Sequence, residues 1–304
     1  MHTDRSFLTR FAWLSILAAL ATIGLKSFAY SLTGSVGLLS DAREALVNLA
    51  GALLALLVLI VAARPPDDEH TYGHSKAEYF SSGVEGALIL VAAASIAVVA
   101  TGRLLDPQPI QQLGVGLLVS VAASLINLGA SLVLLRAARQ HESVTLEANA
   151  THLMSDVWTS AAVLAGVGLV ALTGQAWLDP VVALLAAAHI ARSGLGIARK
   201  AVLGLMDTAL PPEELAQIEE ILAQYTGRNV RYHALRTRQS GARRFVSLHV
   251  LVPGDWDVRR GHNLLERIEG EIRAKLDNAT VLTHLEALED RASFEDQSLD
   301  RGDG

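Results

Sequence analysis

The residues best suited to chemistry are two pairs of polar side chains, each set within a long apolar stretch. Glu44 and Asn48 are four residues apart, and so are His152 and Asp156. On a helix this spacing places both members of a pair on one face. Together they offer carboxylate and amide oxygens and an imidazole, a set that suits a borderline divalent cation. The alternative is that these groups only hydrogen-bond neighbouring helices together, but two such pairs favour a metal site.

The elements that carry these pairs are predicted to be transmembrane helices. The chain is 51% hydrophobic and 18% charged with a mean hydropathy of +0.35, whereas soluble domains carry about 25% charged residues. Charges are sparse in residues 1–203 and dense in 204–304, which indicates a membrane domain followed by a soluble one. Six stretches reach the ~20 apolar residues that a spanning helix needs. They are residues 11–31, 37–63, 80–102, 112–135, 144–173 and 176–198.

The basic residues predict the orientation of these helices. They lie at the amino terminus, between stretches two and three, between four and five, and after six, while Arg103 alone flanks a helix on the other side. The positive-inside rule therefore places both termini in the cytoplasm. Stretches two and five then run in opposite directions, so the Glu44/Asn48 and His152/Asp156 pairs can meet near mid-membrane.

The soluble part, residues 204–290, is predicted to be an α+β domain. An amphipathic helix follows Pro211 and Pro212, and two β-rich runs, 230–238 and 243–252, flank a turn at Gly241. A helix near 257–275 and a strand over 279–288 complete an α-β-β-α-β order. Residues 291–304 are predicted to be a disordered acidic tail.

Several function classes are excluded or disfavoured. Without cysteine, the chain can form neither disulfides nor thiolate metal sites, and its net charge of −6 argues against a nucleic-acid partner. No HExxH motif or Ser/His couple supports an intramembrane metalloenzyme.

Two further acidic residues lie in the predicted membrane helices. Asp41 is three residues before Glu44 and could support that side chain as a metal ligand. Glu85 is interpreted as a helix-packing group.

Three segments together resemble the cation diffusion facilitator family, most closely its bacterial zinc and ferrous-iron efflux pumps. They are SVGLLSDAREALVNLAG, LEANATHLMSD and DDEHTYGHSKAEYF, and the likeness extends from the first helix to about residue 290. The resemblance implies a homodimer in the inner membrane, with six transmembrane helices and a ferredoxin-like cytoplasmic domain. It also implies exchange of a divalent metal for protons.

The loop between the second and third helices holds a second candidate metal site. His70 and His74 have metal-ligand spacing if they are helical, and Asp67 lies one turn earlier. The resemblance assigns these three to a cytoplasmic metal site, and the alternative is a solvated polar loop. It also implies an interlocking ion pair between Lys76 and Asp207 at the membrane–cytosol junction.

The cytoplasmic domain holds a third candidate site. His284 and Glu286 are two apart on a predicted strand, so both face the same way. The resemblance implies metal binding across the dimer interface by these two residues with His233 and His249, and His262 nearby. Ordinary surface histidines are the alternative.

The sequence thus predicts a proton-coupled exporter of a divalent cation, with Zn²⁺ favoured by imidazole and carboxylate ligands. The family usually has His or Asp at the position of Glu44 and Asp at the position of Asn48. Because this chain differs there, Fe²⁺, Mn²⁺, Cd²⁺ and Co²⁺ are kept as alternative transported cations. The alternatives are a membrane-bound metal sensor that does not transport and, less favoured, an intramembrane metalloenzyme.

Overall fold

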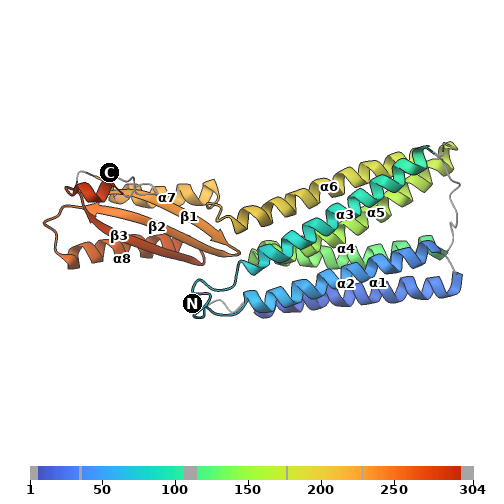
Figure 1. Ribbon diagram of the computed structural model, residues 1–304, viewed down its shortest axis with the longest axis horizontal. Coiled ribbons are helices and arrows are strands. Elements are labelled where there is room, and N and C mark those ends of the chain that lie inside the picture. Colours follow the sequence, from blue (N-terminus) through green and yellow to red (C-terminus); the bar gives the residue numbers. More distant parts are fainter. Residues whose placement is uncertain (1–5, 34–35, 106–114, 176, 228, 296–304) are drawn as a thin grey trace. The chain divides into compact units, whose positions relative to one another are not determined.

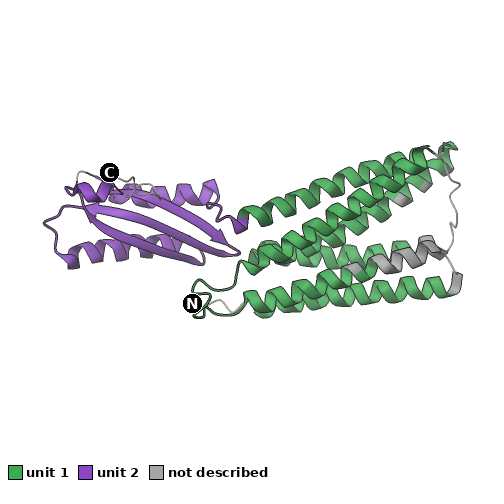
Figure 2. Ribbon diagram, viewed as in Figure 1, with its two compact units in different colours: residues 1–203 green, residues 204–304 purple. Residues whose placement is uncertain are grey.

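The protein forms two compact units, residues 1–203 and 204–304 (Figure 2). The computed structural model describes residues 6–33, 36–105, 115–175, 177–227 and 229–295. Within the second helix, the side chains of residues 36–44 and 47 lie outside this description. The two units are therefore considered one at a time.

Unit 1 consists of long helices (Figure 1). Their bounds are α1 Thr9–Thr33, α2 Val36–Ala62, α3 Ala77–Leu105, α4 Val115–His141, α5 Val144–Thr173 and α6 Leu178–Leu205. Five segments of the described chain are long and apolar enough to cross a membrane, and the searched part of α2, Asn48–Ala62, is a shorter apolar helix. The predicted transmembrane domain is confirmed, while the sixth span, over α2, stays a prediction.

Small residues let these helices approach one another closely. Ala12, Ala52 and Ala150, from α1, α2 and α5, are at most 1% exposed and share one core with residues of α4. Figure 1 shows α3 and α6 side by side, and a Cβ added to Gly86 of α3 would lie 2.9 Å from the backbone nitrogen of Ala198. Close packing of small residues is what holds helices together where lipid replaces water.

Unit 2 confirms the predicted α-β-β-α-β order. Its elements are α7 Pro212–Tyr225, β1 Arg231–Ser240, β2 Arg243–Val252, α8 Val258–Lys275 and β3 Ala279–Ala287. The sheet has the order β1-β2-β3, with β1 and β2 antiparallel and β2 and β3 parallel. Its ferredoxin-like classification stays a prediction.

Alternation along β2 separates the sheet face that packs against α7 and α8 from a second face, which carries Ser247 and His249. Val246, Leu248 and Val250 are buried against residues of α7 and α8, such as Ile218 and Ile268. Successive side chains of a strand point to opposite faces. The intervening side chains of β2 therefore point away from the two helices.

The prediction that disorder begins at residue 291 was wrong for the first residues of that segment. Arg291–Phe294 form a short 3-10 helix, η2, capped by Asp290, whose Oδ1 accepts from the backbone nitrogen of Ala292 at 3.0 Å. Ser293 Oγ donates to the carbonyl of Ala287 at 2.8 Å. These hydrogen bonds attach the segment to the end of β3, whereas the acidic residues that suggested disorder lie mostly beyond 295, outside the described residues.

Candidate metal sites

Three of the four predicted transport ligands come together between α2 and α5. His152 Nε2 lies 2.9 Å from Asn48 Oδ1, and Asn48 Nδ2 donates to Asp156 Oδ2 at 2.5 Å. Asn48 and His152 are 6% and 8% exposed, so this contact is buried in unit 1. The fourth residue, Glu44, and the neighbouring Asp41 lie in α2, but their side chains are outside the described ones, and their roles stay predictions.

Two further helices supply polar groups to this cluster: the sequence interpretation missed Asn127 and took Glu85 for a helix-packing group. Asn127 of α4 donates through Nδ2 to Asp156 Oδ2 at 3.1 Å. Glu85 of α3 has its Oε2 at 3.2 Å from His152 Nδ1, and its Oε1 accepts from Asn149 Nδ2 at 3.0 Å. Both are polar residues within apolar helices, a sequence feature that marks candidate functional residues. Their partners are on other helices, however, so no sequence spacing reveals them.

The arrangement offers both oxygen and nitrogen ligands within a few ångströms. Asp156 Oδ2 accepts hydrogen bonds from two amides, one on α2 and one on α4. The Asn48 carbonyl oxygen, the His152 imidazole and the Asp156 carboxylate are ligand types that Zn²⁺ and similar cations accept. A cation bound here would replace hydrogen bonds between these same atoms.

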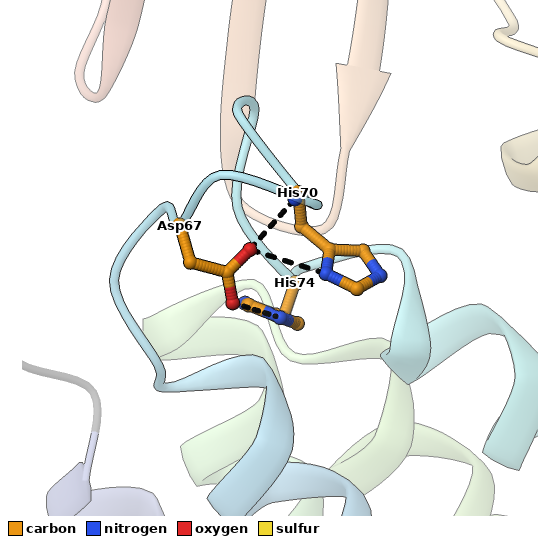
Figure 3. Close-up of side chains that lie close together, drawn as sticks. All are labelled: Asp67, His70 and His74. Carbon is orange, nitrogen blue, oxygen red and sulfur yellow. Dashed lines mark hydrogen bonds and ion pairs between the residues drawn. The ribbon is translucent and has the colours of Figure 1, made fainter.

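The loop between α2 and α3 brings Asp67, His70 and His74 together (Figure 3). Asp67 Oδ1 accepts from the His70 backbone nitrogen at 2.6 Å and lies 3.2 Å from His70 Nδ1. Asp67 Oδ2 lies 3.3 Å from His74 Nε2. In the sequence, His70 and His74 have metal-ligand spacing only if they are helical, and they are not. Residues 63–76 form turns and bends that include Gly73, with a φ of 83°. The turns bring the residues together instead.

The electrostatics of this loop favour a charged carboxylate. The backbone hydrogen bond from His70, aided by its ring and by His74, holds the pKa of Asp67 below its ordinary value. Asp67 and His70 have side chains that are 54% and 53% exposed, whereas that of His74 is 9% exposed. The cluster is open on one side, so an ion can reach it from the surrounding water.

The third cluster lies in unit 2, on the face of the sheet that points away from α7 and α8. Strand pairing sets His233 of β1 opposite His249 of β2, and His249 opposite His284 of β3. Glu286 is central: its Oε2 lies 2.8 Å from His233 Nε2, and its Oε1 lies 3.2 Å from His249 Nδ1 and 3.7 Å from His284 Nε2. His233, His249 and Glu286 have ligand atoms within 4.8 Å of one another.

Within one chain, His262 does not lie beside this cluster, and its place near a site across the dimer interface stays a prediction. His262 is an exposed residue of α8. Leu264 and Ile268 of that helix pack with Leu248 and Val250, on the sheet face opposite to His249. His262 is therefore on the other side of the sheet from the histidine cluster.

The interlocking pair of Lys76 and Asp207 stays a prediction, because Lys76 belongs to unit 1 and Asp207 to unit 2. Within unit 2, Asp207 Oδ1 accepts from Arg238 Nη1 at 3.2 Å. Asp207 has a positive φ of 56° and follows α6 by two residues.

Comparisons with known proteins agree with this architecture. Residues 12–206 match the model of the cation efflux transmembrane domain, and residues 210–288 match that of the cation efflux protein cytoplasmic domain. The uncharacterized transporter sll1263 of Synechocystis sp. is 49% identical over 94% of this chain and 92% of its own length. The cation-efflux pump FieF of Citrobacter koseri is 32% identical over 89% of each chain. A solved structure of CzrB in a Zn form is 32% identical, covering 27% of this chain and 94% of its own, with a TM-score of 0.24.

Helices apolar enough to span a membrane, a buried cluster of nitrogen and oxygen groups among them and a small α+β domain are features of a membrane transporter for cations. The matches over both units identify the family: the chain belongs to the cation diffusion facilitators, which are cation efflux transporters. The predicted resemblance is confirmed.

Proposed function

We propose that this transporter exports a divalent cation from the cytoplasm in exchange for protons, with Glu44, Asn48, His152 and Asp156 as the transport site. The observation that carries the proposal is the buried contact of Asn48 with both His152 and Asp156. A polar cluster of this kind is costly among apolar helices unless it has a function. Rocking of the helices would expose the bound ion first to the cytoplasm and then to the other side.

Zn²⁺ is the favoured cargo. One imidazole and two carboxylates are ligands that Zn²⁺ binds tetrahedrally, and the Asn48 amide oxygen can complete the set. The same oxygen-rich set also suits Fe²⁺ and Mn²⁺, and Co²⁺ and Cd²⁺ are further candidates.

Protons are the proposed counter-ion, because a metal binds these ligands only when they are deprotonated. Protons that reach His152 and the carboxylates from outside would displace the metal, and their release inside would prepare the site again. The proposal places both termini in the cytoplasm and the protein in the inner membrane, with α2 as the sixth span. The match to the cytoplasmic dimerisation domain supports a homodimer.

The loop and tail clusters are proposed as cytoplasmic metal sites outside the transport path. Asp67, His70 and His74 would bind an ion near the cytoplasmic ends of α2 and α3. The sheet cluster of His233, His249 and Glu286, with His284 beside it, would bind metal that stabilises the dimer. Binding to the folded state alone stabilises that state by mass action.

The test is simultaneous measurement of Zn²⁺ uptake and internal pH in proteoliposomes containing the purified protein. Zn²⁺ movement with opposite proton movement, both lost in Asp156→Ala, supports the proposal. A protein that binds Zn²⁺ but moves neither ion would instead be a sensor. Repeating the measurement with Fe²⁺, Mn²⁺, Co²⁺ and Cd²⁺ ranks the cargo.

A further inference from the structure

Glu85 of α3 is the most deeply buried ionisable residue near the transport site. The residue is 0% exposed, in the interior of a helix whose neighbouring residues are mostly apolar. A carboxylate in such a place is costly unless other groups compensate it. The interpretation of Glu85 as a helix-packing group accounts for its burial but not for the groups it contacts.

Both carboxylate oxygens of Glu85 face α5. Oε1 accepts from Asn149 Nδ2 at 3.0 Å, and Oε2 lies 3.2 Å from His152 Nδ1. Asn149 is itself held by Ser15 of α1, whose Oγ donates to Asn149 Oδ1 at 2.6 Å. A Cβ added to Gly51 of α2 would lie 3.5 Å from Oε1, so the backbone of α2 borders the same carboxylate.

The two nitrogens of the His152 ring therefore have different surroundings. Nδ1 faces Glu85, and Nε2 faces the amide oxygen of Asn48. The amide nitrogen of Asn48 in turn donates to Asp156. Without a metal, the Nε2 contact needs a proton on Nε2, because the Asn48 oxygen can only accept. With a metal bound, a proton on Nδ1 would face the Glu85 carboxylate, and the Nε2 lone pair would be left for the ion. Carboxylates that hold the outer nitrogen of a metal-binding histidine fix its tautomer and its ring orientation.

We infer that Glu85 is a positioning residue of the transport site: it holds His152 so that Nε2, rather than Nδ1, binds the metal. The inference rests on the proposed function, because it needs His152 to be a ligand. It adds α3 to the helices that form the site. Any shift of α3 relative to α5 would then change the presentation of the ligand as well as the packing.

The test compares Glu85→Gln with Glu78→Gln in Zn²⁺ transport by proteoliposomes. Glu78 is a matched control, since it is a buried carboxylate of α3 whose Oε2 accepts from Ser143 Oγ at 2.6 Å, at the start of α5. Removing a carboxylate partner of a metal-bound histidine lowers metal affinity about 10- to 100-fold. We expect the Zn²⁺ concentration for half-maximal transport to rise by this factor in Glu85→Gln, to be partly restored in Glu85→Asp, and to stay unchanged in Glu78→Gln. Equal half-maximal concentrations in Glu85→Gln and wild type would overturn the inference.

A second measurement uses the wild-type protein and does not depend on how a variant folds. Nitrogen-15 NMR of histidine-labelled, Zn²⁺-loaded protein, assigned by loss of the signal in His152→Asn, reports which ring nitrogen carries the proton. A proton on Nδ1 supports the inference, and metal on Nδ1 with a proton on Nε2 contradicts it. Wild-type Zn²⁺ affinity and transport in Asp156→Ala would instead refute the transport site itself, so the two failures can be told apart.

Discussion

The membrane cluster and the sheet cluster contain similar residue types but are built in different ways. In unit 1, His152 and Asp156 come from one helix, and Asn48, Asn127 and Glu85 come from three others. In unit 2, one carboxylate serves three histidines that the pairing of adjacent strands places in a row.

The difference is one of solvent and of rigidity. In the membrane cluster, Asn48 and Asn127 both donate to Asp156, because lipid offers no hydrogen bonds to polar groups. The sheet cluster has a side open to water, where the side chain of His284 is 66% exposed. A site made from several helices can change when helices move, whereas the register of a sheet keeps its ligands fixed. The first arrangement suits an ion that must be released, and the second suits an ion that stays.

The largest expected effect is on the membrane cluster. Asp156→Ala removes a charged ligand and the acceptor of two amide hydrogen bonds, so we expect Zn²⁺ transport to be abolished. The protein should remain folded and dimeric by gel filtration and circular dichroism. Asp255→Ala, an exposed position in unit 2, is the control and should transport normally. Near-wild-type flux in Asp156→Ala would remove this residue from the site.

A smaller effect is expected where this chain differs from the usual family pattern. Asn48→Asp adds a carboxylate beside Asp156, and it must be deprotonated before a metal binds. We expect the Zn²⁺ affinity to depend more steeply on pH between about pH 6 and 8, with a shift in preference from Mn²⁺ toward Zn²⁺. Affinity measurements with both ions across this range provide the test. An unchanged slope and unchanged selectivity would show that Asn48 only joins helices.

Disrupting the sheet cluster should have a still smaller effect on transport. His249→Ala combined with His284→Ala removes two imidazoles next to Glu286, and we expect transport to be lowered but not lost. Thermal unfolding should lose the stabilisation of unit 2 by Zn²⁺, which for the wild type is about 2.7 kcal/mol at 100 times the Kd. Arg259→Ala, at an exposed position of α8, is the control and should leave the Zn²⁺ stabilisation unchanged. Zn²⁺ stabilisation that survives in the double variant would contradict the assignment.

The smallest expected effect is the titration of Asp67. Its pKa is lowered in the folded loop, so the contribution of the carboxylate to stability is present above the unfolded pKa of about 3.9 and is lost as the pH falls through the folded value. Asp67 is more than half exposed, so the change in unfolding free energy will be small. Carboxyl carbon NMR from about pH 2 to 6 should show Asp67 titrating below the ordinary range, and less so in His70→Ala, which keeps the backbone donor. A normal pKa in the wild type would contradict the loop geometry.

The sequence by itself determined the elements and much of the ligand set. Apolar length defined the membrane unit, and alternation with turn residues gave the order of unit 2, because these signals depend only on residues close in the chain. The pairs at i, i+4 in α2 and α5 identified Asn48, His152 and Asp156 before any contact between the helices was known. Strand alternation likewise placed His284 and Glu286 on one face.

Only the tertiary structure decided which residues on other elements complete the sites. Glu85 and Asn127 join the membrane cluster through helix packing, and within one chain the sheet separates His262 from the sheet cluster. The loop histidines meet Asp67 because turns, including one at Gly73, bring them together. Local spacing records which side chains share a face, but contacts between faces depend on how whole elements pack, which no short pattern encodes.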